Sequence, residues 1–493
     1  MFKNPTLYEI NTRVWIRKFG KTANNRYLKL DEIPREVWEG YASKGINAIW
    51  LMGVWKTADS AVKKYCFTDF LMRSYDKALK DWRDEDVIGS PYAIDQYVVN
   101  PELGDFDSLL RLKEMLNSMG IMLFLDFVSN HFSAETSLIY SSPEIFLQAD
   151  EETYRRDSHT YFNPKGSSLY FAHGRDPFFP AWEDTVQVNY FSEAGIKYMT
   201  DTLVNIARCC DGVRCDMAML ALDNVFYNTW SGPLNRYGFS HPKENFWRQA
   251  IRKVKEQHPE FTFIAEAYWD LEWELQQLGF DYTYDKKLTD RLIAGSARDI
   301  KLHLLADPQY QSKSVRFIEN HDEERAVTLM GKNKSMAAAV VISTIQGMRF
   351  FHNGQVDGKK IKLPVQLGRA PEEPVNSCMS SFYNKLFSIT RCEVFRKGEW
   401  KLLDPLPSWE DNATFSNMLS WMWRYKDKNC IVVVNYSDSP AQCRLKFDIS
   451  GYEDRFVLTD MLTGTEYIRP CEEVCYQGLY VDLKAYQSHI FFF

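Results

Sequence analysis

Three acidic residues each lie at the end of an apolar run of strand length. Asp216 closes GVRCD, Glu266 follows FTFIA, and Asp322 closes SVRFIENHD. Cleavage of a sugar acetal with retention uses such a set, because one carboxylate attacks the anomeric carbon, a second protonates the leaving oxygen and a third stabilises the positive charge that develops on the ring. A single acid after a strand is usually only an exposed residue, but three in series favour this chemistry. The pattern predicts a retaining glycosidase or a close relative.

Arg214 lies two positions before Asp216. Side chains alternate along a strand with period two, so the guanidinium and the carboxylate share a face and can pair. Such a pair keeps the attacking carboxylate ionised. Glu266 must instead stay protonated at the working pH, and the two nearby anions are expected to raise its pKa. We therefore expect a bell-shaped dependence of activity on pH.

The elements that must position these residues are apolar runs separated by helical stretches. About eight such runs precede residue 355, starting near residues 6, 45, 120, 212, 261, 280, 314 and 347. Strand followed by helix, repeated, indicates a parallel sheet, and eight repeats are typical of an α/β fold, the (β/α)8 or TIM barrel. Active residues of that barrel collect at the C-terminal strand ends. The polar residues at the ends of the runs are Asp126, Asn130, His131, Asp216, Glu266, His321 and Asp322.

Two regions depart from this alternation. From His131 to about Gly195 the chain is rich in proline, aromatic and charged residues, which predicts a small inserted domain after the third strand. After the helix SCMSSFYNKLFSITR the runs become short and alternating, which predicts an antiparallel β-sandwich. The expected domains are a catalytic barrel over 1–131 and 196–396, an inserted domain over 132–195 and a C-terminal sandwich over 397–493.

Composition narrows the class of protein and its partners. The 493 residues are 45% hydrophobic and 25% charged, as in ordinary globular proteins. A net charge of -7 without a basic run argues against nucleic acid and against a membrane surface as partners. No signal peptide is visible at the first residues, and ten scattered cysteines favour a reducing compartment. A cytoplasmic location is therefore expected.

Four segments of the chain resemble, in the right order, the four signature segments of the α-amylase superfamily, glycoside hydrolase family 13. They are DFVSNH, GVRCDMAML, FIAEAYW and FIENHD. The resemblance spans the chain and implies that family's catalytic barrel, a small domain B after the third strand and a C-terminal β domain. It implies that Asp216 is the nucleophile, Glu266 the acid/base and Asp322 the stabiliser of the transition state.

The same resemblance implies roles for the residues around these carboxylates. Arg214 would hold the nucleophile. His131 and His321 would donate hydrogen bonds to the sugar on the nonreducing side of the cleaved bond, and Tyr92, in GSPYAIDQY, would be the aromatic platform beneath that sugar. Asp126 would have a structural role. The expected partner is an α-glucan or oligosaccharide substrate.

The chain also departs from the family pattern. Many starch-cleaving members carry Lys and His three and four residues after the nucleophile, where this chain has Met219 and Leu220. The family often supplies an Asp calcium ligand where Gln187 offers one neutral oxygen, and Asn130 alone does not make a site. Calcium takes about six to eight oxygens with carboxylates among them. We therefore predict no metal ligand and no obligatory cofactor, and calcium stays an open alternative at an incomplete site.

Three functions remain after these observations. The first is hydrolysis of α-glucosidic bonds, foremost α-1,4 bonds, in maltooligosaccharides or α-glucans through a covalent glycosyl-enzyme intermediate. The second is a transglycosidase or a sucrose- or trehalose-active enzyme that shares the first half-reaction. The third is a noncatalytic carbohydrate-binding or partner protein, which the intact carboxylate set disfavours. Linkage and chain-length preference stay open.

Overall fold

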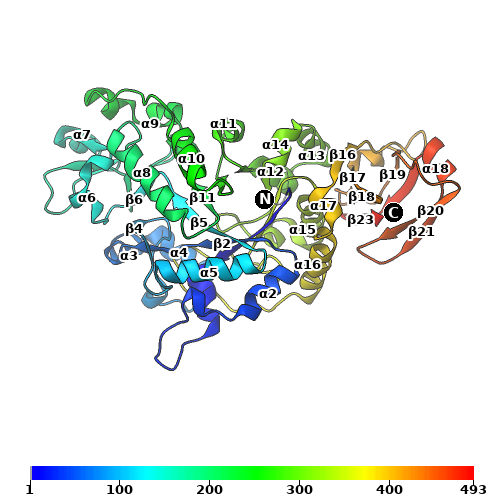
Figure 1. The fold of residues 1–493 in the computed structure, drawn as a ribbon, viewed down its shortest axis with the longest axis horizontal. Helices are drawn as coiled ribbons and strands as arrows, with labels where there is room; N and C mark the ends of the chain where they lie inside the picture. The colour runs from blue at the N-terminus through cyan, green and yellow to red at the C-terminus, as the bar shows by residue number, and fades with distance from the viewer. Residues whose placement is uncertain (1–2) are drawn as a thin grey trace.

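A computed structural model describes residues 3–493, and its centre is a closed barrel of eight parallel strands (Figure 1). The strands follow one another around the barrel in the order β1-β15-β14-β13-β12-β11-β5-β2. Their bounds are β1 Thr6–Asn11, β2 Ala48–Met52, β5 Met122–Val128, β11 Gly212–Asp216, β12 Thr262–Ala265, β13 Tyr282–Tyr284, β14 Ser314–Arg316 and β15 Met348–His352. These are the eight apolar runs of the sequence, so the predicted (β/α)8 barrel is confirmed.

The barrel strands are apolar because both of their faces are buried. In β2 every residue is buried, and successive side chains alternate between two hydrophobic cores. Trp50 points into the barrel interior, where it joins Phe124 and Phe350, whereas Ile49 and Leu51 belong to the core between the strands and the helices. This double burial explains why the runs lack the polar alternation of a half-exposed strand.

Helices surround the barrel on its outer face (Figure 1). The run AAAVVIST at the C-terminal end of α15 is buried next to β15. In residues 3–493 we find no helix whose length and apolar character would let it cross a bilayer. The main helices are α2 Arg35–Ser43, α5 Phe106–Ser118, α8 Glu193–Ile206, α9 Asp223–Arg236, α10 Phe246–Gln257, α11 Glu272–Leu278, α12 Lys286–Ala294, α13 Ala297–Leu304, α15 Ala326–Thr344 and α16 Ser377–Thr390.

Two long excursions leave the barrel near the site. The first, between β2 and β5, contains the antiparallel pair β3 (Trp55–Thr57) and β4 (Ile94–Val99), with α3 (Asp59–Tyr65) and α4 (Asp69–Ala78) between them, and it was not predicted as a separate unit.

The second excursion lies between β5 and α8, where the sequence predicted an inserted domain. Its base is the antiparallel pair of β6 (His131–Ser133) and β10 (Thr185–Gln187), and a small sheet of β7 (Gln148–Ala149), β9 (Tyr170–Ala172) and β8 (Tyr161–Phe162) lies beyond that base. An insertion after the third barrel strand is therefore confirmed. The domain limits given above stay predictions.

The C-terminal part is antiparallel, as predicted. Its six-stranded sheet has the order β16-β17-β18-β23-β20-β21 and faces the pair β19-β22 across a separate apolar core. Trp423 and Tyr436 tie this part to the barrel helices, because they donate hydrogen bonds to the carbonyl oxygens of Thr344 and Leu292, each at 2.6 Å. The bounds are β16 Glu399–Leu403, β17 Met418–Tyr425, β18 Lys428–Asn435, β19 Ala441–Leu445, β20 Arg455–Asp460, β21 Glu466–Pro470, β22 Leu479–Leu483 and β23 Ser488–Phe492.

Candidate active site

Arg214 is the centre of the carboxylate cluster. It is fully buried in β11, and its Nη1 donates to Oδ1 of Asp216 at 2.5 Å. Its Nη2 lies 2.7 Å from Oε2 of Glu266, the residue that follows the neighbouring strand β12. The pairing with Asp216 follows the alternation along one strand and was predicted. The second pairing joins two strands, and the sequence did not indicate it.

Glu266 is surrounded by donors on both oxygens. The backbone N–H of Met217 donates to Oε2 at 2.7 Å, and the hydroxyl of Tyr268 donates to Oε1 at 2.8 Å. Burial raises the pKa of Glu266 to about 7, the charge of Arg214 opposes the rise, and Asp216 and Asp322 add to it. The direction matches the expectation, but burial and not the neighbouring anions is the largest cause.

The backbone between strand β11, which ends at Asp216, and the following turn is unusual at one residue. Met217 has φ 43° and ψ 47°, in the left-handed region that side chains other than glycine seldom occupy. This conformation turns its N–H toward Glu266, and its side chain lines the cleft. The strained residue thus contributes to the hydrogen bonding of the carboxyl group that the sequence assigns to proton transfer.

Asp322 and His321 form a second ionic group. His321 Nε2 lies 3.0 Å from Oδ2 of Asp322, and His321 Nδ1 lies 2.5 Å from Oε1 of Glu9 in β1. Burial opposes protonation of His321, but the two carboxylates outweigh it, so the pKa of this histidine lies well above its usual value. Desolvation would raise the pKa of Asp322, and His321 reverses this and lowers it. The pair therefore persists as an imidazolium and a carboxylate at neutral pH.

Tyr92 and His131 complete the ring of predicted residues. The Tyr92 hydroxyl lies 2.7 Å from Nε2 of His321, and the two rings stack with their centroids 5.3 Å apart. His131 is buried, which lowers its pKa to about 4 and keeps the imidazole neutral near pH 7. Neutral His131 and protonated His321 thus differ in charge, although the family resemblance implies the same role for both.

Most of the predicted residues line one cleft of about 350 Å³. Arg214 lies behind its carboxylates, and His321 lies behind Asp322. Asp126 is further back, 3.8 Å from Arg214 and bound to the N–H of Gly53, in keeping with a structural role. The residues that line the cleft are Ser90, Tyr92, Ala93, His131, Trp182, Asp184, Thr185, Asp216, Met217, Glu266, Tyr268 and Asp322.

Sequence reasoning missed Glu9 and the role of Tyr268. Glu9 is fully buried within the apolar strand TLYEIN, and an acid inside such a run was the available signal. A buried acid needs a partner. The partner of Glu9 is His321, which is far away in the sequence. Tyr268 follows Glu266 by two residues in FIAEAYW, and its hydroxyl donates to Glu266.

Further aromatic side chains lie in or near the cleft. Trp182 lines the cleft. Phe178 and Phe179 are about two-thirds exposed, and the ring of Phe178 contacts Trp269 at a centroid distance of 4.9 Å. Trp269 belongs to the loop that follows Glu266, so this exposed pair joins the inserted segment to the Glu266 side of the cleft.

The residues at the calcium position of the family do not fit a cation. Nε2 of Gln187 donates to the carbonyl oxygen of Asn130 at 2.8 Å, to its side-chain oxygen at 2.9 Å and to the carbonyl oxygen of Val188 at 3.1 Å. An amide nitrogen therefore occupies the point that these oxygens face. Calcium also requires carboxylates in its ligand set, and these three contacts include none.

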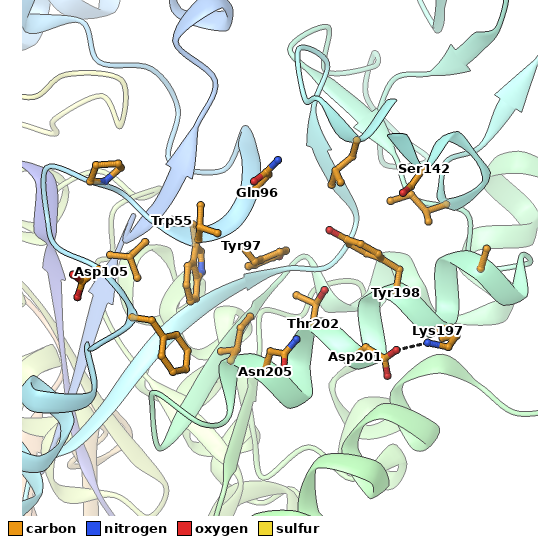
Figure 2. Close-up of a pocket in the computed structure, with 18 of the residues that line it drawn as sticks. Trp55, Gln96, Tyr97, Asp105, Ser142, Lys197, Tyr198, Asp201, Thr202 and Asn205 are labelled. Carbon is orange, nitrogen blue, oxygen red and sulfur yellow. Dashed lines mark hydrogen bonds and ion pairs between the residues drawn. The ribbon is translucent and has the colours of Figure 1, made fainter. Parts of the chain in front are cut away.

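A larger hollow of about 930 Å³ lies apart from the carboxylates (Figure 2). Tyr198 and Thr202 reach into it from α8, and Trp55 and Tyr97 line it from β3 and β4. Trp55 and Tyr97 hydrogen-bond the carbonyl oxygens of Asp126 and Val128, so the hollow adjoins strand β5 outside the catalytic cleft. Its volume alone does not make it the active site, because none of the predicted site residues lines it.

Comparison with known proteins gives one family throughout. A family model for the alpha amylase catalytic domain matches residues 42–430. An α-amylase of Haloarcula japonica is 22% identical over 433 residues, which are 86% of this chain and 54% of that protein. An α-1,4-glucan:maltose-1-phosphate maltosyltransferase of Picrophilus torridus is 21% identical over 284 residues, which are 55% of this chain and 38% of that protein.

Solved structures share the whole fold. A maltogenic α-amylase of Thermotoga neapolitana superposes with a TM-score of 0.68 at 20% identity, covering 100% of this chain and 99% of that one.

The chain spans about half the length of the first two curated relatives, 54% and 38% respectively.

Proposed function

Because the chain belongs to the α-amylase family, we propose that it cleaves α-glucosidic bonds, foremost α-1,4 bonds, in maltooligosaccharides or α-glucans with retention of configuration. One observation carries this proposal. Arg214 contacts Asp216 and Glu266 at once, so the two carboxyl groups lie close together in the cleft, and burial raises the pKa of Glu266 to about 7. A retaining reaction needs such a close pair in opposite protonation states.

The proposed reaction has two steps. In the first, a carboxylate oxygen of Asp216 bonds to the anomeric carbon as the bond to the leaving oxygen breaks, and the proton of Glu266 passes to that oxygen. In the second, Glu266 takes a proton from water, whose oxygen attacks the anomeric carbon and releases Asp216. The second step restores the Asp216 carboxylate and the Glu266 proton that the first step used, and one water molecule is consumed overall.

The residues around Asp216 and Glu266 stabilise the charges on the nucleophile and on the sugar ring during cleavage. Arg214 offsets the negative charge of Asp216 before attack. Asp322, held ionised by His321, places a negative charge where the ring becomes positive. Tyr92 and neutral His131 line the same cleft, and we propose that they bind the sugar on the nonreducing side.

The first test follows maltoheptaose by proton NMR with the wild-type protein. We expect shorter maltooligosaccharides whose new reducing ends are first released as the α-anomer. First release of the β-anomer would contradict retention. No reaction of maltoheptaose would exclude this substrate, and sucrose and trehalose would then be tried as donors.

Transfer to a second sugar is the alternative that the comparisons support, because one relative is named a maltosyltransferase. The exposed pair of Phe178 and Trp269 on the acid/base side could bind an acceptor sugar by stacking. Products longer than maltoheptaose in the same experiment would favour transfer over hydrolysis.

The pKa of Glu266 predicts the alkaline limit of activity. The pKa is raised to about 7, so the proton needed for cleavage is present below that pH and is lost as the pH rises through it. We expect kcat/KM for maltoheptaose to fall about tenfold for each pH unit above this limit. A maltosyl fluoride donor needs no protonation of its leaving group, so its cleavage should not show this limb.

Asp126 is the competing origin of that limb, because burial raises its pKa to about 7 as well. The Asp126→Asn variant separates the two groups. If Glu266 is responsible, the variant keeps the alkaline limb at the same pH, and a limb that vanishes in this variant would assign it to Asp126.

We also propose a cytoplasmic location. Within residues 3–493 all ten cysteines are free thiols, including the close pair Cys471 and Cys475. Free thiols suit a reducing compartment. The partner proposed for this chain is its glucan substrate.

A further inference from the structure

We propose that the side-chain amide of Gln187 takes the place of a structural cation. It connects the inserted segment to the barrel and so positions His131 in the cleft. The first part of this inference stands on packing and does not depend on the activity. Only the effect on sugar binding rests on the proposed function.

Three buried oxygens converge on one nitrogen. The carbonyl oxygen of Asn130, its side-chain oxygen and the carbonyl oxygen of Val188 lie 2.8, 2.9 and 3.1 Å from Nε2 of Gln187. Gln187 is 0% exposed and Asn130 is 1% exposed, so water does not compete at these contacts. An amide carries two hydrogens, and three acceptors around it form the kind of oxygen cage that otherwise surrounds a cation.

The cage lies where the inserted segment leaves and re-enters the barrel. Strand β5 ends at Val128, and Asn130 is on the outgoing chain. Gln187 and Val188 are on the returning chain, and the backbone N–H of Val188 donates to the carbonyl oxygen of Asn130 at 3.0 Å. The side chain of Gln187 therefore adds two contacts with Asn130 to a backbone hydrogen bond that already joins both ends of the insertion.

His131 depends on this junction. It follows Asn130 and is the residue opposite Gln187 in the pairing of β6 with β10. Nδ2 of Asn130 lies 3.4 Å from Nδ1 of His131. Gly174 packs so closely here that a Cβ atom on it would be 3.1 Å from the Cβ of His131. A shift of Asn130 would therefore move the imidazole within the cleft.

The side chain at position 187 determines whether a cation can bind at this junction. A cation would be attracted by the three oxygens, but the N–H group of Gln187 already faces them. Glutamate at this position would replace the donor by a carboxylate and leave four or more oxygens facing one another. These oxygens repel one another when no cation is present, and they match the ligands that calcium prefers when it is present.

The experiment compares thermal unfolding of wild type, Gln187→Glu and Gln187→Met in EDTA and in millimolar calcium chloride. We expect the same Tm for wild type in both buffers. Gln187→Glu should unfold several degrees lower in EDTA and recover in calcium, and Gln187→Met should be lowered equally in both. Gln276→Glu is the matched control, because Gln276 is a buried amide with one partner, Thr283, and should not respond to calcium.

Two outcomes would overturn the inference. They are a wild-type Tm that falls in EDTA and returns with calcium, and a Gln187→Glu variant whose Tm does not respond to calcium. The positioning of His131 is read separately from KM. We expect Gln187→Met to raise KM for maltoheptaose several-fold with a smaller change in kcat, and an unchanged KM would refute the positioning role. If wild type has no activity on glucans, the proposed function fails while the unfolding data still decide the inference.

Discussion

Asp216→Asn is expected to abolish both cleavage of maltoheptaose and formation of any covalent intermediate. The amide cannot attack the anomeric carbon, so we expect a loss of at least about 10⁴-fold in kcat, the order found when a covalent nucleophile is removed. The change keeps the size of the side chain and its place beside Arg214. The measurement is steady-state release of reducing ends, with mass spectrometry of the intact protein to detect bound sugar.

Glu266→Gln is the matched variant, because it removes the proton donor and leaves the nucleophile. With maltoheptaose it should be about as inactive as Asp216→Asn, since the poor leaving group needs a proton. With maltosyl fluoride the leaving group departs unaided, so Glu266→Gln should form the covalent intermediate and hydrolyse it slowly. Bound sugar on Asp216→Asn but not on Glu266→Gln would reverse the two assigned roles.

Removal of Arg214 is expected to give the second large effect. Arg214→Met leaves Asp216 and Glu266 in a buried site without their shared cation. Breaking a buried ion pair costs about 3–5 kcal/mol, which corresponds to roughly 10² to 5 × 10³-fold in rate if the reactive protonation states bear the whole cost. We expect kcat to fall by this order and thermal stability to fall as well, measured by steady-state kinetics and by scanning calorimetry.

Arg349→Met is the control for stability alone. Arg349 is equally buried, but it binds the carbonyl oxygens of Thr390 and Phe395 and no carboxylate of the site. This variant should lower Tm while the activity per folded molecule stays close to wild type. Equal losses of activity in the two variants would mean that Arg214 acts only through stability.

The barrel and its carboxylates were predictable because their signals are local. A strand buried on both faces is largely apolar, and the eight apolar runs of the sequence reflect this burial. The three candidate carboxylates lie at or after the ends of their strands, and a parallel barrel brings such ends together on one rim. Asp216, Glu266 and Asp322 could be chosen as candidates from their positions in their own segments.

The arrangement around the carboxylates was less predictable. Arg214 contacts Glu266 only because β11 lies beside β12 in the barrel, and Glu9 contacts His321 only because the barrel closes the chain on itself. The excursion between β2 and β5 was read as part of the barrel, although it carries Tyr92 to the cleft. Its short strands give the sequence little periodicity from which to recognise a separate unit.

The sequence by itself therefore determined the fold class and the residues able to do the chemistry, because burial and strand ends leave a pattern in neighbouring positions. Only the tertiary structure decided their electrostatics: burial gives Glu266 its raised pKa, and Glu9 gives His321 its second carboxylate. It also decided that the amide of Gln187 faces the three oxygens at the base of the insertion. These properties depend on distances between segments far apart in the chain, and such distances exist only after folding.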